Sequence, residues 1–274
     1  MSGYRGGTPT RGSEAASRGI VVMSAEADTK KSREGGLSET VRVVIHALIL
    51  AMVVRVFIYQ PFNIPSGSMI PTLLVGDYLF VSKFSYGYSK YSLPFSLNLF
   101  SGRIMSSEPR RGDVAVFKLP KDNKTDYIKR VIGVPGDKIQ MLDGVLQING
   151  SPVPKKRVDD FLAEDSFGNI RRVARYQETL PNGVQYEVLD LIPRGSGDNT
   201  NIYKVPEGHY FMMGDNRDNS TDSRVSSAVG YVPSENFIGR AEVIFFSSGG
   251  DARFWEFWKW FGSIRLNRFF QMVD

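Results

Sequence analysis

The sequence predicts a mainly β protein, with a single N-terminal transmembrane helix followed by an antiparallel β-sheet region. One long apolar run lies near the N-terminus, and the chain beyond it alternates short β-like runs with turn signals. Thirteen of the 14 prolines and 20 of the 27 glycines are spread through this later region, and no β-α-β rhythm is present. Together these observations favour an antiparallel sheet over a parallel one.

The first element, residues 1–36, is predicted to be a disordered tail. It is rich in Gly, Ser, Thr and charged residues, and little of it could bury a hydrophobic face. We expect a solvated extension with no role of its own.

Residues 37–60 are predicted to form a transmembrane anchor helix. Their apolar part would be roughly 25 Å long as a helix, which is short for a hydrocarbon core of about 30 Å. A core helix or a cleaved signal segment is the alternative for so short a run. Arg55 falls nearly opposite Arg42 and His46 on a helix, so no polar stripe is present. No small-residue cleavage site follows, and Pro61 ends the helix.

The charges that flank the anchor predict its orientation. Lys30, Lys31, Arg33 and Arg42 precede the apolar run, whereas residues 61–82 contain no Lys or Arg. The positive-inside rule therefore predicts a cytoplasmic N-terminus and places the rest of the chain on the other side of the membrane.

The formal net charge of +5 does not indicate a nucleic-acid partner. One basic cluster is present, made of Lys155, Lys156, Arg157, Arg171, Arg172 and Arg175. Acidic residues interrupt it, so we expect a solvated face.

The residue counts limit the possible chemistry. The chain has no cysteine, which excludes thiolate nucleophiles and thiolate metal sites, and only two histidines. No H-E-x-x-H, S-x-x-K or G-x-S-x-G motif occurs. We therefore expect no metal and no cofactor, and a hydrolase built on this chain must work with very little imidazole.

Three segments carry polar residues where a β core would not need them: 64–73, 126–137 and 214–224. Prolines and a glycine stiffen the first around two serines, which alone would suit a rigid stem. The second holds a lysine within a strand-like run, usually a solvent-facing position. The third is dense in charge and could be a loop tip or a calcium loop, but its arginines and its lack of a terminal glutamate argue against calcium.

Taken together with residues 111–114, these segments resemble bacterial type I signal peptidase, over residues 43–246 and in the order of that family. The resemblance implies that Ser68 is the nucleophile and Lys129 the general base and acid. It implies that Ser66, with the backbone N–H of Ser68, forms the oxyanion hole. It further implies that Ser220 orients the lysine. Four more residues would knit the site together through ion pairs and hydrogen bonds: Arg130, Asp215, Asp222 and Arg224.

The resemblance also implies a substrate, the signal peptide of an exported preprotein, held in shallow apolar pockets that accept alanine-sized side chains. The residues that match pocket positions are Phe62, Ile64, Pro65, Met69, Leu73, Tyr127 and Ile128. The implied partners are signal peptides and membrane lipids, with neither nucleic acid nor metal. The implied location is the bacterial inner membrane, crossed once, with the catalytic region in the periplasm.

The resemblance divides the chain after the anchor into a catalytic core of residues 61–137 and 207–250, with an inserted β subdomain at 138–206. Residues 251–274 form an aromatic and basic amphipathic segment. We expect this last segment to lie on the membrane, and the alternative is a flap packed on the β core.

Elementary chemistry agrees with a Ser–Lys pair. A serine nucleophile needs a base, and the scarcity of histidine leaves lysine as the known alternative. A lysine with a pKa of about 10.4 is protonated at neutral pH, so burial of Lys129 must lower its pKa before it can act. Two other readings stay open: a self-cleaving LexA-like Ser–Lys protease and an inactive membrane-tethered β scaffold.

Overall fold

The computed structural model describes residues 21–92, 102–164, 169–192, 194–249, 258 and 263–273, without the side chains of 21–37 and 164. The chain divides into two units, Met1–Met52 and Val53–Asp274. Apart from the one long helix, the described residues form mainly antiparallel strands, which confirms the predicted fold class.

The helix α1 runs from Val21 to Phe57, and its portion Ser38–Phe57 is long and apolar enough to cross a membrane, with a mean hydropathy of 2.1. The expectation of a disordered tail was wrong for residues 21–36, because good helix formers such as alanine, glutamate and lysine are frequent there. Residues 1–20 lie outside the described residues. The helix also ends earlier than expected, since Tyr59 and Gln60 already belong to a strand.

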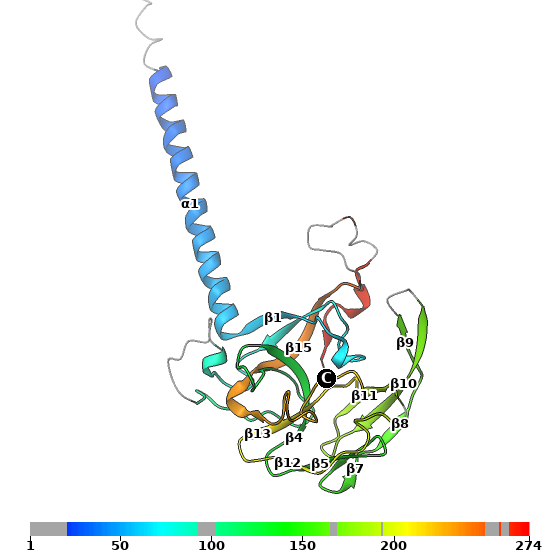
Figure 1. Ribbon diagram of the computed structural model, residues 1–274. Coiled ribbons are helices and arrows are strands. Elements are labelled where there is room, and N and C mark those ends of the chain that lie inside the picture. The colour runs from blue at the N-terminus through cyan, green and yellow to red at the C-terminus, as the bar shows by residue number, and fades with distance from the viewer. Residues whose placement is uncertain are drawn as a thin grey trace, which may run out of the picture. The chain divides into compact units, whose positions relative to one another are not determined.

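One large antiparallel sheet has the order β1-β2-β15-β3-β4-β13-β14, with β16 paired to β15. Its strands are β1 (Tyr59–Asn63), β2 (Asp77–Ser82), β3 (Val114–Lys118), β4 (Asp126–Gly133), β13 (His209–Met213), β14 (Val232–Pro233), β15 (Phe237–Ser247) and β16 (Gln271–Met272). The long strand β15 pairs with β2 at one end and β3 at the other (Figure 1). It crosses β2 closely at Gly239, where a Cβ would lie 2.2 Å from the Ser82 carbonyl oxygen.

Two smaller sheets arise from the segment between β4 and β13 (Figure 1). Their strands are β5 (Lys138–Leu142), β6 (Val145–Ile148), β7 (Ser151–Pro152), β8 (Lys155–Arg157), β9 (Phe161–Glu164), β10 (Ile170–Thr179), β11 (Gln185–Asp190) and β12 (Tyr203–Lys204). One sheet has the order β11-β10-β8 with β9 on β10, and the other has the order β12-β5-β6-β7. They share a core with the main sheet, because Ile139 and Val188 pack in one cluster with Ile132 and Phe211.

Four short 3-10 helices are described: η1 (Gly67–Met69), η2 (Lys90–Ser92), η4 (Ser234–Asn236) and η5 (Leu266–Arg268). The turn at η1 rests on a second core cluster, in which Ile64, Met69 and Leu73 are almost completely buried. The chain on either side of Ser68 is therefore anchored in this core cluster.

The described part of the C-terminal segment lies on the main sheet. Ile264 forms a bridge to Ser248, and β16 pairs with β15. Arg268 donates to both carboxylate oxygens of the buried Asp77, so it is not a membrane-facing cation. For residues 263–273 the expectation of a membrane-lying helix was therefore wrong, because the arginine finds a buried partner. Most of the aromatic stretch falls outside the described residues.

Candidate active site

Ser68 lies within η1, which begins directly after Pro65 and Ser66. It is buried, with 7% of its surface exposed, and the neighbouring Met69 side chain fills the core beneath it. A short turn fixed at one end by proline and at the other by a buried methionine holds the serine hydroxyl in one place.

Lys129 reaches Ser68 from the middle of β4, and 4% of its surface is exposed. Its Nζ lies 2.6 Å from Ser68 Oγ and 2.9 Å from the Ile128 carbonyl oxygen. Burial lowers the pKa of Lys129 to about 8, although Asp222 and Asp215 act in the opposite direction. A substantial fraction of this amine is therefore neutral near pH 8, so it can accept a proton.

A cavity of about 500 Å³ opens onto both groups. Ser66 lines it with an exposed side chain whose hydroxyl makes no capping bond to η1. Five of the predicted pocket residues also line it: Phe62, Ile64, Pro65, Tyr127 and Ile128. Met69 and Leu73 do not, since both are wholly buried in the core, so their assignment to the pocket was wrong.

Further residues line the same cavity without having been predicted: Asn63, Val116, Thr125, Asp126, Asn219 and Thr221. Asn219 and Thr221 belong to a segment singled out for its charge, so its polar uncharged members could have been considered as well. For Val116 the sequence held no signal, because only the pairing of β3 with β4 brings it next to Ile128.

The 214–224 loop contacts the Ser68 turn through Asn216. The Asn216 backbone N–H donates to the Ser68 carbonyl oxygen at 3.1 Å, and its side-chain amide donates to the Gly67 carbonyl oxygen at 2.9 Å. Gly214 allows this approach, since a Cβ there would lie 2.5 Å from the Ser68 carbonyl oxygen.

Ser220 also packs against Gly214, whose Cβ would fall 2.2 Å from the Ser220 hydroxyl. That hydroxyl is buried and makes no hydrogen bond within 3.5 Å to a described residue. Burial raises the pKa of the nearby Asp222 carboxyl, but Arg224 and the Gly214 N–H outweigh this effect and hold that pKa below its usual range. The expected bond from Ser220 to Lys129 is therefore not formed in this structure.

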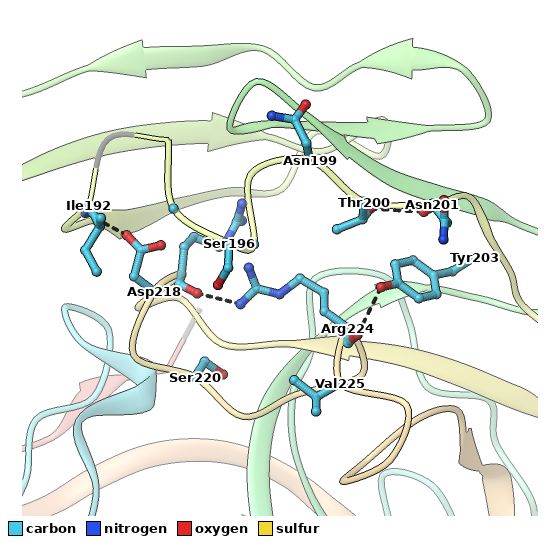
Figure 2. Close-up of a pocket in the computed structure, with 13 residues that line it drawn as sticks. Ile192, Ser196, Asn199, Thr200, Asn201, Tyr203, Asp218, Ser220, Arg224 and Val225 are labelled. Carbon is cyan, nitrogen blue, oxygen red and sulfur yellow. Dashed lines mark hydrogen bonds between the residues drawn. The ribbon is translucent and has the colours of Figure 1, made fainter.

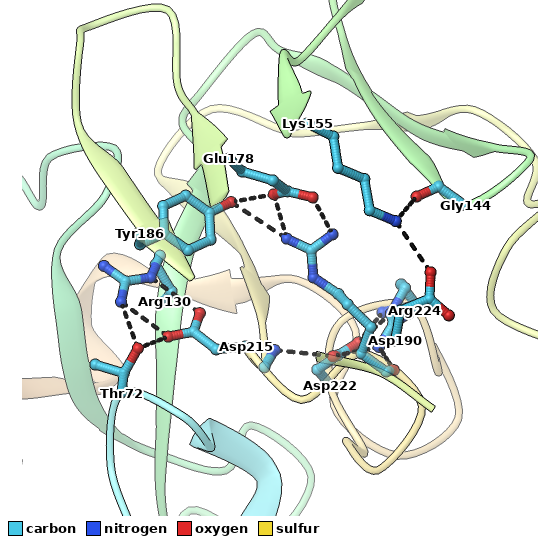
Figure 3. A network of polar contacts seen from close by, with 12 residues as sticks. Thr72, Arg130, Gly144, Lys155, Glu178, Tyr186, Asp190, Asp215, Asp222 and Arg224 are labelled. Carbon is cyan, nitrogen blue, oxygen red and sulfur yellow. Dashed lines mark hydrogen bonds and ion pairs between the residues drawn. The ribbon is translucent and has the colours of Figure 1, made fainter. Parts of the chain in front are cut away.

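Two aspartates that lie near Lys129, Asp215 and Asp222, are each held in an ion pair, and Figure 3 shows both pairs. Arg130 forms a two-bond pair with Asp215, at 2.9 and 2.8 Å, and both side chains are buried. Arg224 forms a similar pair with Asp222, at 2.9 Å for each bond. The predicted partners thus come together as expected, next to the lysine and on the loop.

A larger cavity, of about 590 Å³, lies beside the loop between residues 192–203 and 217–225 (Figure 2). Its charged groups are already engaged: Asp218 accepts from the Ile192 backbone, and Arg224 donates to the Arg217 carbonyl oxygen. Ser220 lines this cavity, whereas its neighbours Asn219 and Thr221 line the smaller cavity beside Ser68 and Lys129. The loop therefore separates the two cavities.

Among the described residues, no group of three or more His, Asp or Glu side chains is placed to hold a metal ion, and the chain has no cysteine. The chemistry that these side chains offer is a hydroxyl beside an amine, in a cavity lined by both apolar and polar side chains.

Comparison with known proteins shows the family to which the chain belongs. A family profile described as "Signal peptidase, peptidase S26" matches residues 37–246. The signal peptidase I of Rickettsia prowazekii (strain Madrid E) is 42% identical over 243 residues, covering 82% of this chain and 89% of that protein. The signal peptidase I of Rickettsia canadensis (strain McKiel) is 40% identical over 263 residues, covering 89% and 96%.

Among solved structures, a signal peptidase I from Enterococcus faecalis V583 is 26% identical and covers 49% of this chain and 97% of its own, with a TM-score of 0.28. The chain is a serine endopeptidase. It belongs to the signal peptidase family, peptidase S26.

Proposed function

We propose that this chain removes N-terminal signal peptides from exported preproteins, with Ser68 as the nucleophile and Lys129 as the general base. The observation that carries the proposal is the distance of 2.6 Å between Lys129 Nζ and Ser68 Oγ, at the wall of a cavity that could hold a peptide. A nucleophile within hydrogen-bond reach of its base is the geometric requirement for this chemistry.

In the acylation step, neutral Lys129 takes the proton of the Ser68 hydroxyl as Oγ attacks the carbonyl carbon of the scissile peptide bond. The tetrahedral intermediate collapses when the C–N bond breaks, and the lysine passes the same proton to the departing amine. The signal peptide is then an ester on Ser68. In the second step water adds to the ester, Lys129 accepts its proton and returns it to Ser68, and the free carboxylate leaves.

The negative charge of each intermediate is held by two donors, the Ser66 hydroxyl and the Ser68 backbone N–H. The exposed Ser66 side chain at the cavity wall supports this role, because its hydroxyl is not used to cap η1. Loss of one such donor costs roughly 10²–10³ in rate.

The substrate proposal is a cleavage site with small side chains, of the Ala-x-Ala type. Ile64, Tyr127 and Ile128 give the cavity an apolar wall beside Ser68. A cavity of this kind suits a small apolar side chain at the first and third positions before the cleaved bond. Large side chains would have to displace well-packed strand residues.

We further propose that the enzyme crosses the bacterial inner membrane once, with a cytoplasmic N-terminus and a periplasmic catalytic region. The apolar portion Ser38–Phe57 and the basic residues before it support this topology. Lipid contact by the β unit is supported by three exposed aromatic side chains near its first strands: Tyr59, Tyr78 and Phe84 are 37%, 39% and 49% exposed.

The test is cleavage of a preprotein by the full chain in detergent, with Ser68→Ala and Lys129→Ala compared with wild type. We expect both variants to lose activity by at least about 10³-fold. Exposed residues of the same types provide matched controls: Ser227→Ala and Lys121→Ala should retain wild-type rates. Cleavage by Ser68→Ala at the wild-type rate, or wild-type inhibition by a chelator, would contradict the mechanism.

A further inference from the structure

A buried array of charged side chains links the inserted sheets to the 214–224 loop (Figure 3). Glu178 of β10 is completely buried and pairs with Arg217 of the 214–224 loop through two bonds, of 2.9 and 2.5 Å. Tyr186 of β11 donates its hydroxyl proton to the same carboxylate at 2.7 Å. Glu178 therefore has two buried partners, one from its own sheet and one from the loop.

The array reaches the neighbour of the catalytic lysine through Tyr186. The Arg130 guanidinium lies 4.3 Å from the centre of the Tyr186 ring, and Arg130 directly follows Lys129 in β4. Arg130 is also bound to Asp215, at the start of the loop. One tyrosine from the inserted sheets thus contacts Arg130 with its ring and Glu178 with its hydroxyl.

A second connection runs from β11 to the Ser68 turn. The Leu189 backbone N–H donates to the Asp215 carbonyl oxygen at 2.9 Å, and the Arg217 N–H donates to the Leu189 carbonyl oxygen at 3.0 Å. Asn216, between these two loop residues, donates to the Ser68 carbonyl oxygen. The loop is therefore held between β11 on one side and the nucleophile turn on the other.

The charges of the array cancel. Three buried or nearly buried guanidinium groups, of Arg130, Arg217 and Arg224, are each paired with one carboxylate, of Asp215, Glu178 and Asp222 respectively. Because no carboxylate of these pairs is left over, none is available as a full counter-charge for protonated Lys129. Loss of the charge of Glu178 would leave one excess positive charge in the array.

We propose that Glu178 and Tyr186 are positioning residues for the Ser68–Lys129 pair, acting through Arg217, Arg130 and the 214–224 loop. This inference rests on the proposed Ser68–Lys129 mechanism. It gives the inserted sheets a catalytic role: they hold the loop that contacts the nucleophile turn, and they keep the charge around the lysine balanced.

The groups that face Lys129 come from several elements. Asp215 and Asp222 face it from the loop, Ser68 from η1, and Tyr127 from its own strand, with its ring centre 5.4 Å from Nζ. Asp126 lines the same cavity and is paired with Lys118. A variant that changes only the distant Glu178 leaves all of these groups in place.

The experiment measures kcat, KM and the pH dependence of kcat/KM for preprotein cleavage by the full chain in detergent. The variants are Glu178→Gln, which removes the charge at constant size, and Tyr186→Phe, which removes only the hydroxyl. The matched control is Glu187→Gln, on the same strand as Tyr186 but in a partly exposed pair with Arg175. The melting temperature of each variant is measured in parallel.

For Glu178→Gln we expect kcat to fall by about tenfold or more, with KM changed by less than about threefold, because the cavity wall is untouched. The midpoint of the pH profile should move to lower pH, since an excess positive charge disfavours protonated Lys129. Tyr186→Phe should lower kcat even at temperatures well below its own melting temperature, where it is folded, and Glu187→Gln should behave as wild type.

A merely structural role would give a different result. If both variants keep the wild-type kcat and pH midpoint, or if kcat falls only in proportion to a loss of folded protein with the midpoint unchanged, the inference is overturned. Failure of the proposed mechanism is recognised separately, because Ser68→Ala would then cleave, or the wild-type profile would show no ionisation near pH 8.

Discussion

At the scale of single residues, the account depends on one buried amine. Lys129 has lost most of its contact with water but keeps hydrogen bonds to Ser68 and to the Ile128 carbonyl oxygen. Desolvation is the largest influence on its pKa, and the two nearby aspartates only partly oppose it. The same burial that makes the lysine a base therefore lowers the stability of the folded state.

The first prediction concerns activity and pH. With the pKa of Lys129 lowered to about 8, kcat/KM should rise about tenfold per pH unit below that value and level off above it. The measurement is a pH–rate profile with a peptide that has no titratable groups near the cleaved bond. A profile that falls as pH rises from 6 to 9 would contradict a neutral lysine as the base.

The second prediction concerns stability. Between the folded pKa of about 8 and the ordinary lysine pKa of 10.5, the unfolded chain binds the proton and the folded chain does not, so wild-type stability should rise with pH there. Below pH 8 the full cost of the buried charge is present. Lys129→Met should therefore raise the unfolding free energy at pH 7 by roughly 1–3 kcal/mol, as measured by denaturant unfolding.

Lys121→Met, at an exposed position, is the control for that measurement and should change stability little. If Lys129→Met is less stable than wild type at pH 7 and the difference does not depend on pH, burial of the amine is not costly and the assigned pKa is wrong.

The residues that sequence could identify are those in compact motifs. Ser68 and Lys129 were predicted from short segments, and the structure brings them together across 61 positions of the chain. Met69 and Leu73 were misassigned because a turn has no fixed periodicity from which the buried side can be read. Glu178 and Tyr186 were missed because their partners lie far away, Arg217 being 39 positions from Glu178, and only the fold makes them neighbours.

At the scale of elements, the C-terminal strand and its 3-10 helix act as a strap on the main sheet. Arg268 of η5 donates to the fully buried Asp77 of β2 and to the Thr72 carbonyl oxygen, close to the chain that carries Ser68. Asp77 also accepts from the Ser247 hydroxyl of β15. One carboxylate thus joins two strands and the strap.

The third prediction follows from this contact. Arg268→Met should lower the unfolding free energy by about 3–5 kcal/mol, because it leaves the Asp77 carboxylate buried without its main partner. The comparison is Arg157→Met, which breaks an exposed pair with Asp160 and should change the unfolding free energy little. Equal effects of the two substitutions on chemical unfolding would show that the strap does not stabilise the sheet.

At the scale of the whole molecule, the fold class was predictable because the apolar anchor and the alternating β runs are strong local signals. The start of α1 was not predictable, because residues 21–36 contain good helix formers but have an overall composition typical of disordered tails. The two inserted sheets share a core with the main sheet, a feature that no local pattern reveals.

The fourth prediction is that the anchor determines location and not chemistry. All the site residues lie in the unit Val53–Asp274. A chain that begins at Val53 should therefore keep kcat/KM for a short peptide within about threefold of the full chain. Its cosedimentation with lipid vesicles should decrease. Loss of peptide cleavage by a shortened chain that melts normally would contradict this separation.

The central claim is that Ser68 carries the covalent intermediate, and trapping that intermediate tests it most directly. The full chain is mixed with a substrate peptide, quenched in acid within the first turnover, digested and analysed by mass spectrometry. The account predicts that the acyl fragment of the substrate is attached at Ser68 in the wild type and absent from Ser68→Ala. An acyl group found at Ser66 or Ser220 instead, or undiminished turnover by Ser68→Ala, would contradict the account.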